Sequence, residues 1–316
     1  MLPEHWGFGV DDAGVNKRVG VLGSTSLVGS CLLPLLLDAG LQVSAFSRKA
    51  VSRAGDGVEW RQLLPLSLLQ HSQARPSHLK NNIAGEECVS LWICVAPIWV
   101  LPEHFALMET HGARRVVVLS STSHFTKFES PDPKEQVIAH RLAGAESRVR
   151  DWAESRGVEW VILRPTLIYG LGRDKNIAEI ARFIRRFGFF PLFGKANGLR
   201  QPIHAADVAA ACLSALYSPS AVNRAYNISG GETLAYRNMV ARIFIALGYH
   251  PRLLTVPLWA FRLAVIVLRH LPRYRQWSTA MVERMNRDLV FDHAEAARDF
   301  GFKPKAFVLS AGDLAI

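Results

Sequence analysis

The sequence is poor in cysteine, and its four cysteines show no spacing that suits a metal site. Each of the four, Cys31, Cys88, Cys94 and Cys212, lies in an apolar stretch. Such residues are typical of free buried thiols in a reducing compartment. We therefore expect no metal site and a cytoplasmic location.

The sequence also lacks an export signal and a long hydrophobic run. Residues 1–17 are mixed and partly acidic, so they predict an N-terminal extension rather than a signal peptide. A membrane span needs about 20 mostly apolar residues, and the nearest candidate, Val256–Leu271, is interrupted by Arg262. We therefore expect no spanning helix.

Acidic residues are in deficit, with 27 against 37 lysines and arginines and a net charge of +10. This balance favours anionic partners such as nucleotide phosphates, anionic lipid surfaces or nucleic acid. The sequence shows no helix-turn-helix pattern, no zinc knuckle and no basic run interleaved with aromatics. We therefore expect a small anionic substrate and no nucleic acid.

Apolar residues make up 49% of the chain, which is enough for a full core, and strands alternate with helices through the first half. This alternation predicts an α/β fold with a doubly wound parallel sheet. Expected strands are 19–22, 42–46, 59–60, 89–95, 115–119 and 160–163. Expected helices are 27–36, 102–110, 135–155, 177–186, 206–217, 235–247 and 257–270.

The first strand runs into a turn of small residues and then a helix, the arrangement that a dinucleotide site requires. The chain reads VGVLGSTSLVGS over residues 19–30. Glycines stand at Gly23 and Gly29, but the middle position of the G-x-x-G-x-x-G pattern is Ser26. We expect the cofactor to contact Gly23, Ser24, Thr25, Ser26, Leu27, Val28 and Gly29.

The second strand lacks the acidic residue that an NAD site usually places at its end. Ser47, Arg48 and Lys49 stand there instead. An arginine at this place suits the 2′-phosphate of NADP, so we expect NADP as cofactor, with NAD as the alternative. The alternative is that Arg48 and Lys49 are two solvated surface charges with no role in binding.

Five segments together resemble the extended short-chain dehydrogenase/reductase family, of the NAD-dependent epimerase/dehydratase type. They are VLGSTSLVG, VVVLSSTS, ILRPTLIYG, QPIHAADVAAA and AYNISGGE, in the order that the family uses. The chain also resembles the atypical branch that includes the nucleotide-binding accessory subunit of respiratory complex I. The resemblance implies a Rossmann-type domain and a smaller, mainly C-terminal substrate domain. We expect an extension at 1–17, the NAD(P) domain at 18–170 and the substrate domain at 171–316, with residues 201–230 returning to the sheet.

The resemblance also implies site residues. The end of the fifth strand carries the family's catalytic hydroxyl, which corresponds to Ser121 and Thr122. Further cofactor contacts are implied at Val95, Ala96, Pro165 and Thr166. Arg173, Lys175 and Arg200 flank the expected cleft and suit a diphosphate or another anion.

The chain departs from the family at its catalytic pair. The family uses a Tyr and a Lys four residues later, on the helix after the fifth strand. Aligning Glu146 with the acid that usually follows places Ile138 and Leu142 at these two positions, and the first tyrosine of the chain is Tyr169. His140 on the same helix is a candidate acid/base, the alternative being a solvated histidine.

These features predict an NAD(P)-binding oxidoreductase or epimerase that acts on a sugar-nucleotide-like or lipid-linked substrate. The alternative is a non-catalytic nucleotide-binding assembly or regulatory protein. Val256–Arg275 carries arginines on one side and apolar residues on another, so it suits either an anionic membrane surface or an ordinary core-covering helix. Leu142 and its neighbours are candidates for pairing helices across a homodimer.

Overall fold

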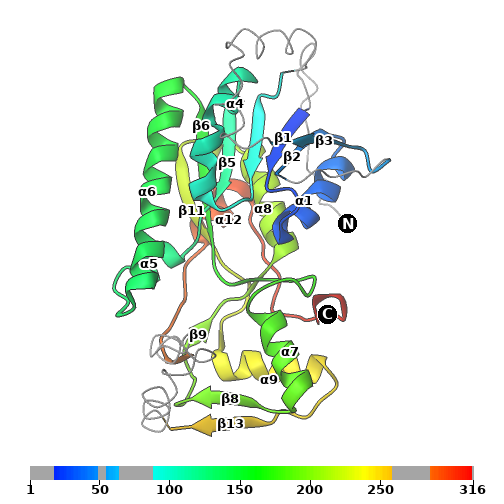
Figure 1. Ribbon diagram of the computed structural model, residues 1–316, viewed down its shortest axis with the longest axis vertical. Helices are drawn as coiled ribbons and strands as arrows, with labels where there is room; N and C mark the ends of the chain where they lie inside the picture. Colours follow the sequence, from blue (N-terminus) through cyan, green and yellow to red (C-terminus); the bar gives the residue numbers. More distant parts are fainter. Residues whose placement is uncertain (1–17, 49–54, 64–87, 258–284, 315–316) are drawn as a thin grey trace, which may run out of the picture.

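The computed structural model describes residues 18–48, 55–63, 88–257 and 285–314. The larger domain is built on a seven-stranded sheet in the order β11-β6-β5-β4-β1-β2-β3, and every neighbouring pair is parallel (Figure 1). The strands are β1 (Arg18–Leu22), β2 (Gln42–Ser47), β3 (Val58–Gln62), β4 (Leu91–Cys94), β5 (Arg115–Leu119), β6 (Glu159–Pro165) and β11 (Arg224–Ile228). This order confirms the predicted doubly wound α/β fold.

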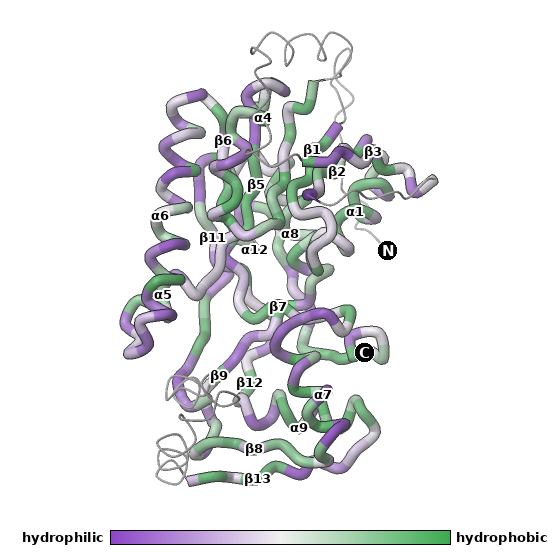
Figure 2. The backbone as a smooth tube through the Cα atoms, viewed as in Figure 1, coloured by the Kyte–Doolittle hydropathy of each residue, from purple (hydrophilic) through white to green (hydrophobic). Residues whose placement is uncertain are grey.

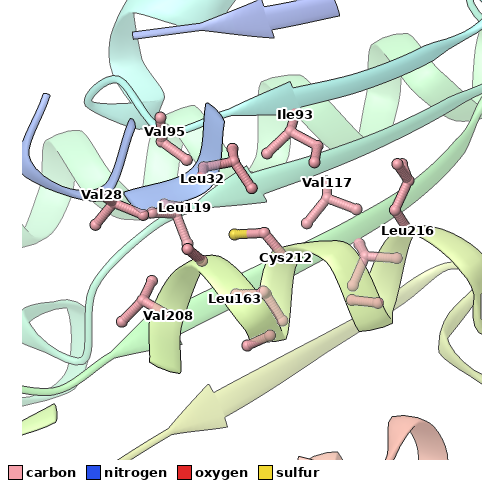
Figure 3. Packing of buried hydrophobic residues seen from close by; sticks show 14 of the residues in the cluster. Val28, Leu32, Ile93, Val95, Val117, Leu119, Leu163, Val208, Cys212 and Leu216 are labelled. Atoms are coloured by element: carbon pink, nitrogen blue, oxygen red, sulfur yellow. The ribbon is translucent and has the colours of Figure 1, made fainter. Parts of the chain in front are cut away.

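Helices cover both faces of this sheet. They are α1 (Leu27–Asp38), α8 (Ala205–Tyr217) and α12 (Ala294–Phe300) on one face, and α4 (Phe105–Thr110) and α6 (Pro133–Arg156) on the other. Side chains alternate along β5, so Val117 packs toward α1 and α8 while Val116 and Val118 pack toward α6. Figure 3 shows the first of these clusters, with Leu32 and Cys212 beside Val117.

The strand order reverses at β1, since β2 lies on one side of it and β4 on the other. Ligands of such sheets bind outside the carboxyl ends of the strands at this reversal. The turn after β1 and the segment after β4 therefore border the place where a dinucleotide is expected.

After β6 the chain enters a smaller domain, returns to the sheet through α8 and β11, and then leaves it again. The smaller domain contains β7 (Ile168–Tyr169), α7 (Ile177–Phe187), β8 (Phe190–Phe193), β9 (Leu199–Arg200), β10 (Ile203–His204), β12 (Leu234–Ala235), α9 (Tyr236–Ala246) and β13 (Leu253–Val256). Its core includes Ile184 of α7, Leu192 of β8 and Phe244 of α9.

Two local predictions were wrong. In place of one helix over 102–110, the chain forms a 3-10 helix, η1 (Ile98–His104), and then the α-helix α4. The reason is that Pro102 has no N–H to donate, so a regular α-helix begins only beyond it. The strand β6 does not end before Pro165, which remains in register with Ile228. The proline stands at the last residue of β6, and its carbonyl accepts a hydrogen bond from Thr122 N at 3.1 Å.

Leu142 is not available for the predicted homodimer contact, because this side chain is 3% exposed and packs in the core beneath α6, and the homodimer itself stays a prediction. The predicted helix 257–270 lies outside the described residues except for Pro257. Among the helices that the structure describes, none is long and apolar enough to cross a bilayer. Within the same ranges, no cluster of three or more metal-ligating side chains occurs.

Candidate functional site

The turn between β1 and α1 is too tight for side chains at its two glycines. Gly23 has φ +83°, and a Cβ there would lie 2.4 Å from the backbone nitrogen of Ala96. A Cβ on Gly29 would lie 2.4 Å from the carbonyl oxygen of Ser24. These glycines bring α1 and the segment after β4 close together, as a diphosphate cradle requires.

Ser26 replaces the middle glycine of the pattern without strain. Its φ of −70° and ψ of 171° suit any residue, and its hydroxyl caps α1 by accepting from Gly29 N at 3.0 Å. The cap leaves the amides of Leu27 and Val28 without a partner among the described residues, since the first amides of a helix have no acceptor within the helix. The local geometry therefore fits a diphosphate at the start of α1.

The end of β2 lies where the adenosine of a dinucleotide is expected. Ser24 Oγ donates to the carbonyl of Phe46 at 3.1 Å, which ties the turn to β2. Ser47 is buried and Arg48 is exposed, while Lys49 lies outside the described residues. Val95 N donates to the carbonyl of Leu22 at 2.9 Å, so the segment after β4 is fixed to β1.

Arg173 reaches the nucleotide turn from the other domain. It lies in the loop between β7 and α7, and its two Nη atoms donate to the carbonyl of Thr25 at 3.1 Å and to Ser30 Oγ at 3.0 Å. The same loop is anchored at Leu171, whose N–H donates to the Asp313 carboxylate at 3.3 Å. A guanidinium therefore stands beside the expected diphosphate, a position that the sequence had placed only near the cleft.

A cavity of about 710 Å³ lies between the carboxyl ends of β5 and β6 and the smaller domain. Ser121, Thr122 and Thr166 line it from the sheet side. Its other polar and aromatic walls include Lys127, Glu135, Lys175, Glu179, Arg200, Gln201, Tyr236, Arg287 and Phe291. Four cations therefore stand against two carboxylates, a balance that suits an anionic ligand.

One of the cavity cations, Arg200, is held by the smaller domain itself. Arg200 is 4% exposed, and its Nη1 donates to the carbonyls of Leu199 and Arg287 at 2.6 and 2.8 Å. Its guanidinium carbon lies 5.6 Å from the centre of the Tyr236 ring. These contacts fix the guanidinium against the cavity wall before a ligand arrives.

The two predicted catalytic hydroxyls have different partners. Thr122 Oγ1 donates to the carbonyl of Pro165 at 3.1 Å and is buried. Ser121 Oγ accepts from Ser123 N at 3.1 Å, and this bond leaves its hydroxyl proton free to donate. Thr166 Oγ1 donates to the carbonyl of Gln201 at 2.5 Å, which joins the end of β6 to the cavity wall. Ser121 is thus the better placed donor.

Beneath these hydroxyls lies a buried charged group that the sequence analysis missed. Arg164 Nε and Nη2 donate to the Glu146 carboxylate at 3.0 and 2.5 Å, and Ser120 Oγ donates to it at 2.5 Å. His124 Nδ1 lies 3.7 Å from the same carboxylate. We call these four residues the Glu146 cluster. Glu146 shares the inward spacing of Leu142 and Val149 on α6, which could have indicated a buried acid.

Two groups of the Glu146 cluster have shifted pKa values. Burial opposes ionisation of Glu146, but the hydrogen bonds from Arg164 and Ser120 outweigh it and hold its pKa below the ordinary value. Burial lowers the pKa of His124, against the opposing attraction of Glu146. The cluster is therefore an ionised carboxylate–guanidinium pair beside a neutral imidazole, and it holds the ends of β5 and β6 to α6.

The remaining candidates on α6 do not reach the cavity. His140 is exposed, and its ring centre lies 4.7 Å from that of Phe128. Ile138 is 37% exposed and Leu142 is buried in the core, and neither lines the cavity. The helix contains no tyrosine. The two positions aligned with the family's catalytic pair therefore leave the cavity open.

Comparison with known proteins bears on this geometry. Residues 104–229 match the family described as "NAD dependent epimerase/dehydratase family", a range that includes β5, α6, β6 and β11. The UDP-glucose 4-epimerase of Vibrio cholerae is 24% identical over 160 residues, 51% of this chain and 46% of that protein. The 2-alkyl-3-oxoalkanoate reductase of Stenotrophomonas maltophilia is 24% identical over 326 residues, 92% and 96% of the two chains.

The mitochondrial NADH dehydrogenase [ubiquinone] 1 alpha subcomplex subunit 9 of Arabidopsis thaliana is 27% identical over 100 residues, 31% of this chain and 25% of that protein. The chain spans about half the length of the first curated relatives that it matches. Among solved structures, the UDP-glucose 4-epimerase of Thermus thermophilus in complex with NAD has a TM-score of 0.62 at 19% identity, covering 94% and 97% of the two chains. This structural likeness shows the fold.

The matches and the parallel sheet agree with the motifs quoted from the sequence. The resemblance to the epimerase type and to the complex I branch is confirmed. The chain is therefore similar to the extended short-chain dehydrogenases/reductases, and its residues 104–229 match the NAD-dependent epimerase/dehydratase family.

Proposed function

We propose that this protein binds NADP, with NAD as the alternative, and acts as an oxidoreductase or epimerase on a small anionic molecule. The observation that carries the proposal is the pairing of an unstrained nucleotide turn with an open, cation-rich cavity. A nicotinamide cofactor supplies the hydride chemistry when it is bound. The residues described above bind and orient the reactants.

The preference for NADP rests on the end of β2. Arg48 is exposed where an acid would accept hydrogen bonds from the ribose of NAD. A guanidinium at this place can donate charge-assisted hydrogen bonds to a 2′-phosphate. Ser47, Arg48 and Lys49 stay the predicted adenosine contacts.

Arg173 is our proposed ligand of the cofactor diphosphate, together with the amides of Leu27 and Val28. Its guanidinium uses two of its five N–H groups on the turn, and the others remain to donate to phosphate oxygens. Lys175, two residues later, lines the cavity. The loop from Gly170 to Asn176 would therefore touch cofactor and substrate at once.

In the cavity, Lys127, Lys175, Arg200 and Arg287 favour a phosphate- or carboxylate-bearing substrate of the sugar-nucleotide or lipid-linked type. Ser121 is the proposed hydroxyl donor to a substrate oxygen, and Thr122 positions it by fixing the end of β5 to Pro165. His140 takes no part in this proposal, since it does not line the cavity.

A second candidate function is a nucleotide-binding assembly or regulatory protein. The absence of a tyrosine from α6 favours it, because the family's acid/base pair has no counterpart there. The open cavity at Ser121 and Thr122 favours the enzyme. The two candidates share the nucleotide site and differ in the use of the cavity.

The test is calorimetric titration of the purified protein with NADPH, NADH, NADP⁺ and NAD⁺. We expect NADPH to bind, Arg48→Ala to weaken NADPH about tenfold or more, and the same substitution to leave NADH nearly unchanged. No binding of any of the four would overturn the enzyme proposal and the nucleotide-binding alternative together.

Two shorter ligands separate the roles of the two arginines. ADP-ribose contains the diphosphate without a 2′-phosphate, and 2′,5′-ADP contains the 2′-phosphate without a diphosphate bridge. Arg173→Ala should weaken ADP-ribose about tenfold and spare 2′,5′-ADP, and Arg48→Ala should do the reverse. Equal losses for both ligands in either variant would contradict the assignment.

Substrate binding separates the enzyme from the assembly protein. The probes are UDP-glucose and an acyl-CoA, titrated into the NADPH-saturated protein and then tested for cofactor turnover by absorbance. We expect one anionic probe to bind, and Arg287→Gln to weaken it while NADPH binding is retained. Tight cofactor binding with neither probe binding nor turning over would favour the assembly role.

A further inference from the structure

We propose that the free end of the smaller domain is a docking surface for an anionic lipid membrane. The surface consists of the end of α7 with the turn that follows it, 185–189, and the loop between α9 and β13, 248–252. We call these two segments the tip. This inference is independent of the proposed enzymatic function.

The two segments of the tip are neighbours in space. Phe190 N donates to the carbonyl of Arg252 at 3.0 Å, and β13 then runs parallel to β8 (Figure 1). Every residue from Arg185 to Phe189 and from Gly248 to Arg252 is exposed. The tip is therefore a continuous surface formed by two loops at one end of the molecule.

The tip exposes large apolar side chains. Phe187 is 50% exposed, Phe189 is 37% exposed and Tyr249 is 49% exposed. Phe187 and Phe189 both lie against Phe183, at ring-centre distances of 4.6 and 5.9 Å, so they form a preset aromatic cluster. Exposed aromatic groups of this kind mark binding surfaces, and amphipathic aromatics favour the membrane interface.

The tip also carries cations that have no acidic partner within the described part of the chain. Arg185, Arg186 and Arg252 make no ion pair with any residue that the structure describes. Arg186 instead covers the Phe187 ring, with 5.3 Å from its guanidinium carbon to the ring centre. The sequence has no acidic residue between Glu179 and Asp207, and none between Glu232 and Glu283.

The positive charge of the tip distinguishes between two possible partners, a second copy of the chain and an anionic bilayer. Two copies of the chain meeting at the tip would bring like charges together, which costs association free energy. An anionic bilayer attracts each arginine near its surface and accepts the phenylalanines in its interfacial region. Figure 2 shows apolar and polar segments alternating through this end of the molecule. An anionic lipid surface therefore suits both the arginines and the exposed phenylalanines of the tip.

The experiment is co-sedimentation of the full chain with vesicles of phosphatidylcholine, with and without 30% phosphatidylglycerol. We expect binding to the anionic vesicles and at least tenfold weaker binding to the neutral ones. Arg185→Gln with Arg186→Gln should reduce binding to anionic vesicles about thirtyfold, as two surface charges at about 1 kcal/mol each predict. Phe187→Ser with Phe189→Ser should reduce it at least tenfold.

The matched control removes two exposed arginines from the larger domain, Arg148→Gln with Arg150→Gln on α6. It changes the net charge equally and should leave vesicle binding within about twofold. Equal losses in the control and the tip variant would mean a general effect of net charge and would overturn the proposal. So would unchanged binding by the phenylalanine variant, or a monomer–dimer equilibrium by ultracentrifugation that the tip variants abolish.

Discussion

The two domains of this protein use their charges differently. In the larger domain, cations meet carboxylates: Arg164 pairs with Glu146, Arg61 with Glu59 and Arg156 with Glu109. In the smaller domain, Arg242 pairs with Glu232 and Arg182 lies 3.9 Å from Glu179, but the sequence has no acid from 180 to 206 or from 233 to 282. Arg185, Arg186 and Arg252 make no ion pair among the described residues, so their charges remain available to an anionic ligand or surface.

The largest expected effect comes from breaking the buried pair of the larger domain. Glu146→Ala removes a buried carboxylate and leaves the half-buried Arg164 guanidinium without its partner, which should cost about 3–5 kcal/mol in the free energy of unfolding. Urea denaturation measures the loss. Adding Arg164→Met should restore part of it, and no restoration would mean that the two residues act separately.

An exposed pair gives the matched control for this measurement. Arg156 Nε lies 3.1 Å from Glu109, and both side chains are partly exposed. Glu109→Gln should change the free energy of unfolding by about 0–1 kcal/mol. A loss as large as that of Glu146→Ala would contradict the role given to burial.

The next effect concerns the nucleotide turn. Gly23→Ala combines an unfavourable φ with a clash against Ala96, so it should cost about 1–3 kcal/mol and abolish NADPH binding. Gly157→Ala is the control, since Gly157 has φ +65° but nothing within 4 Å of a Cβ. It should cost about 1 kcal/mol or slightly more and leave NADPH binding intact. Calorimetry with and without ligand measures both.

A third effect is the dependence of stability on pH. The folded-state pKa of His124 lies below its ordinary 6.5, so the unfolded chain takes up the proton first and stability falls as the pH drops below 6.5. The folded-state pKa of Glu146 lies below 4.5, so its contribution is complete above 4.5 and is lost as the pH falls further. Thermal unfolding from pH 8 to about pH 2 should show both windows, and His124→Gln should flatten only the upper one.

The smallest expected effect is in the other domain. Arg185→Gln with Arg186→Gln removes two exposed cations that form no ion pair among the described residues, so the free energy of unfolding should change by no more than about 0.5 kcal/mol. Chemical denaturation measures it. A loss above about 1 kcal/mol would show that these cations stabilise the fold, and would erase the contrast between the domains.

Much of the larger domain follows from local sequence. The almost purely β-branched run from Arg115 to Leu119 and the apolar run ending at Leu22 predict buried parallel strands, because strands covered on both faces are apolar throughout. The change to helical spacing after Ser26 predicts α1 and its cap. The break between η1 and α4 is harder to predict from the sequence, because tertiary packing decides whether a helix continues past a proline or is interrupted there.

The amino-acid sequence by itself determined the strand–helix alternation, the glycine turn, the excess of cations and the absence of a tyrosine from α6. Only the tertiary structure decided which distant residues meet. Arg173 contacts Thr25, Glu146 holds Arg164, and the two loops of the tip lie side by side. Periodicity and spacing report which face a residue occupies within its own element, whereas partners from other elements are fixed by how the elements pack.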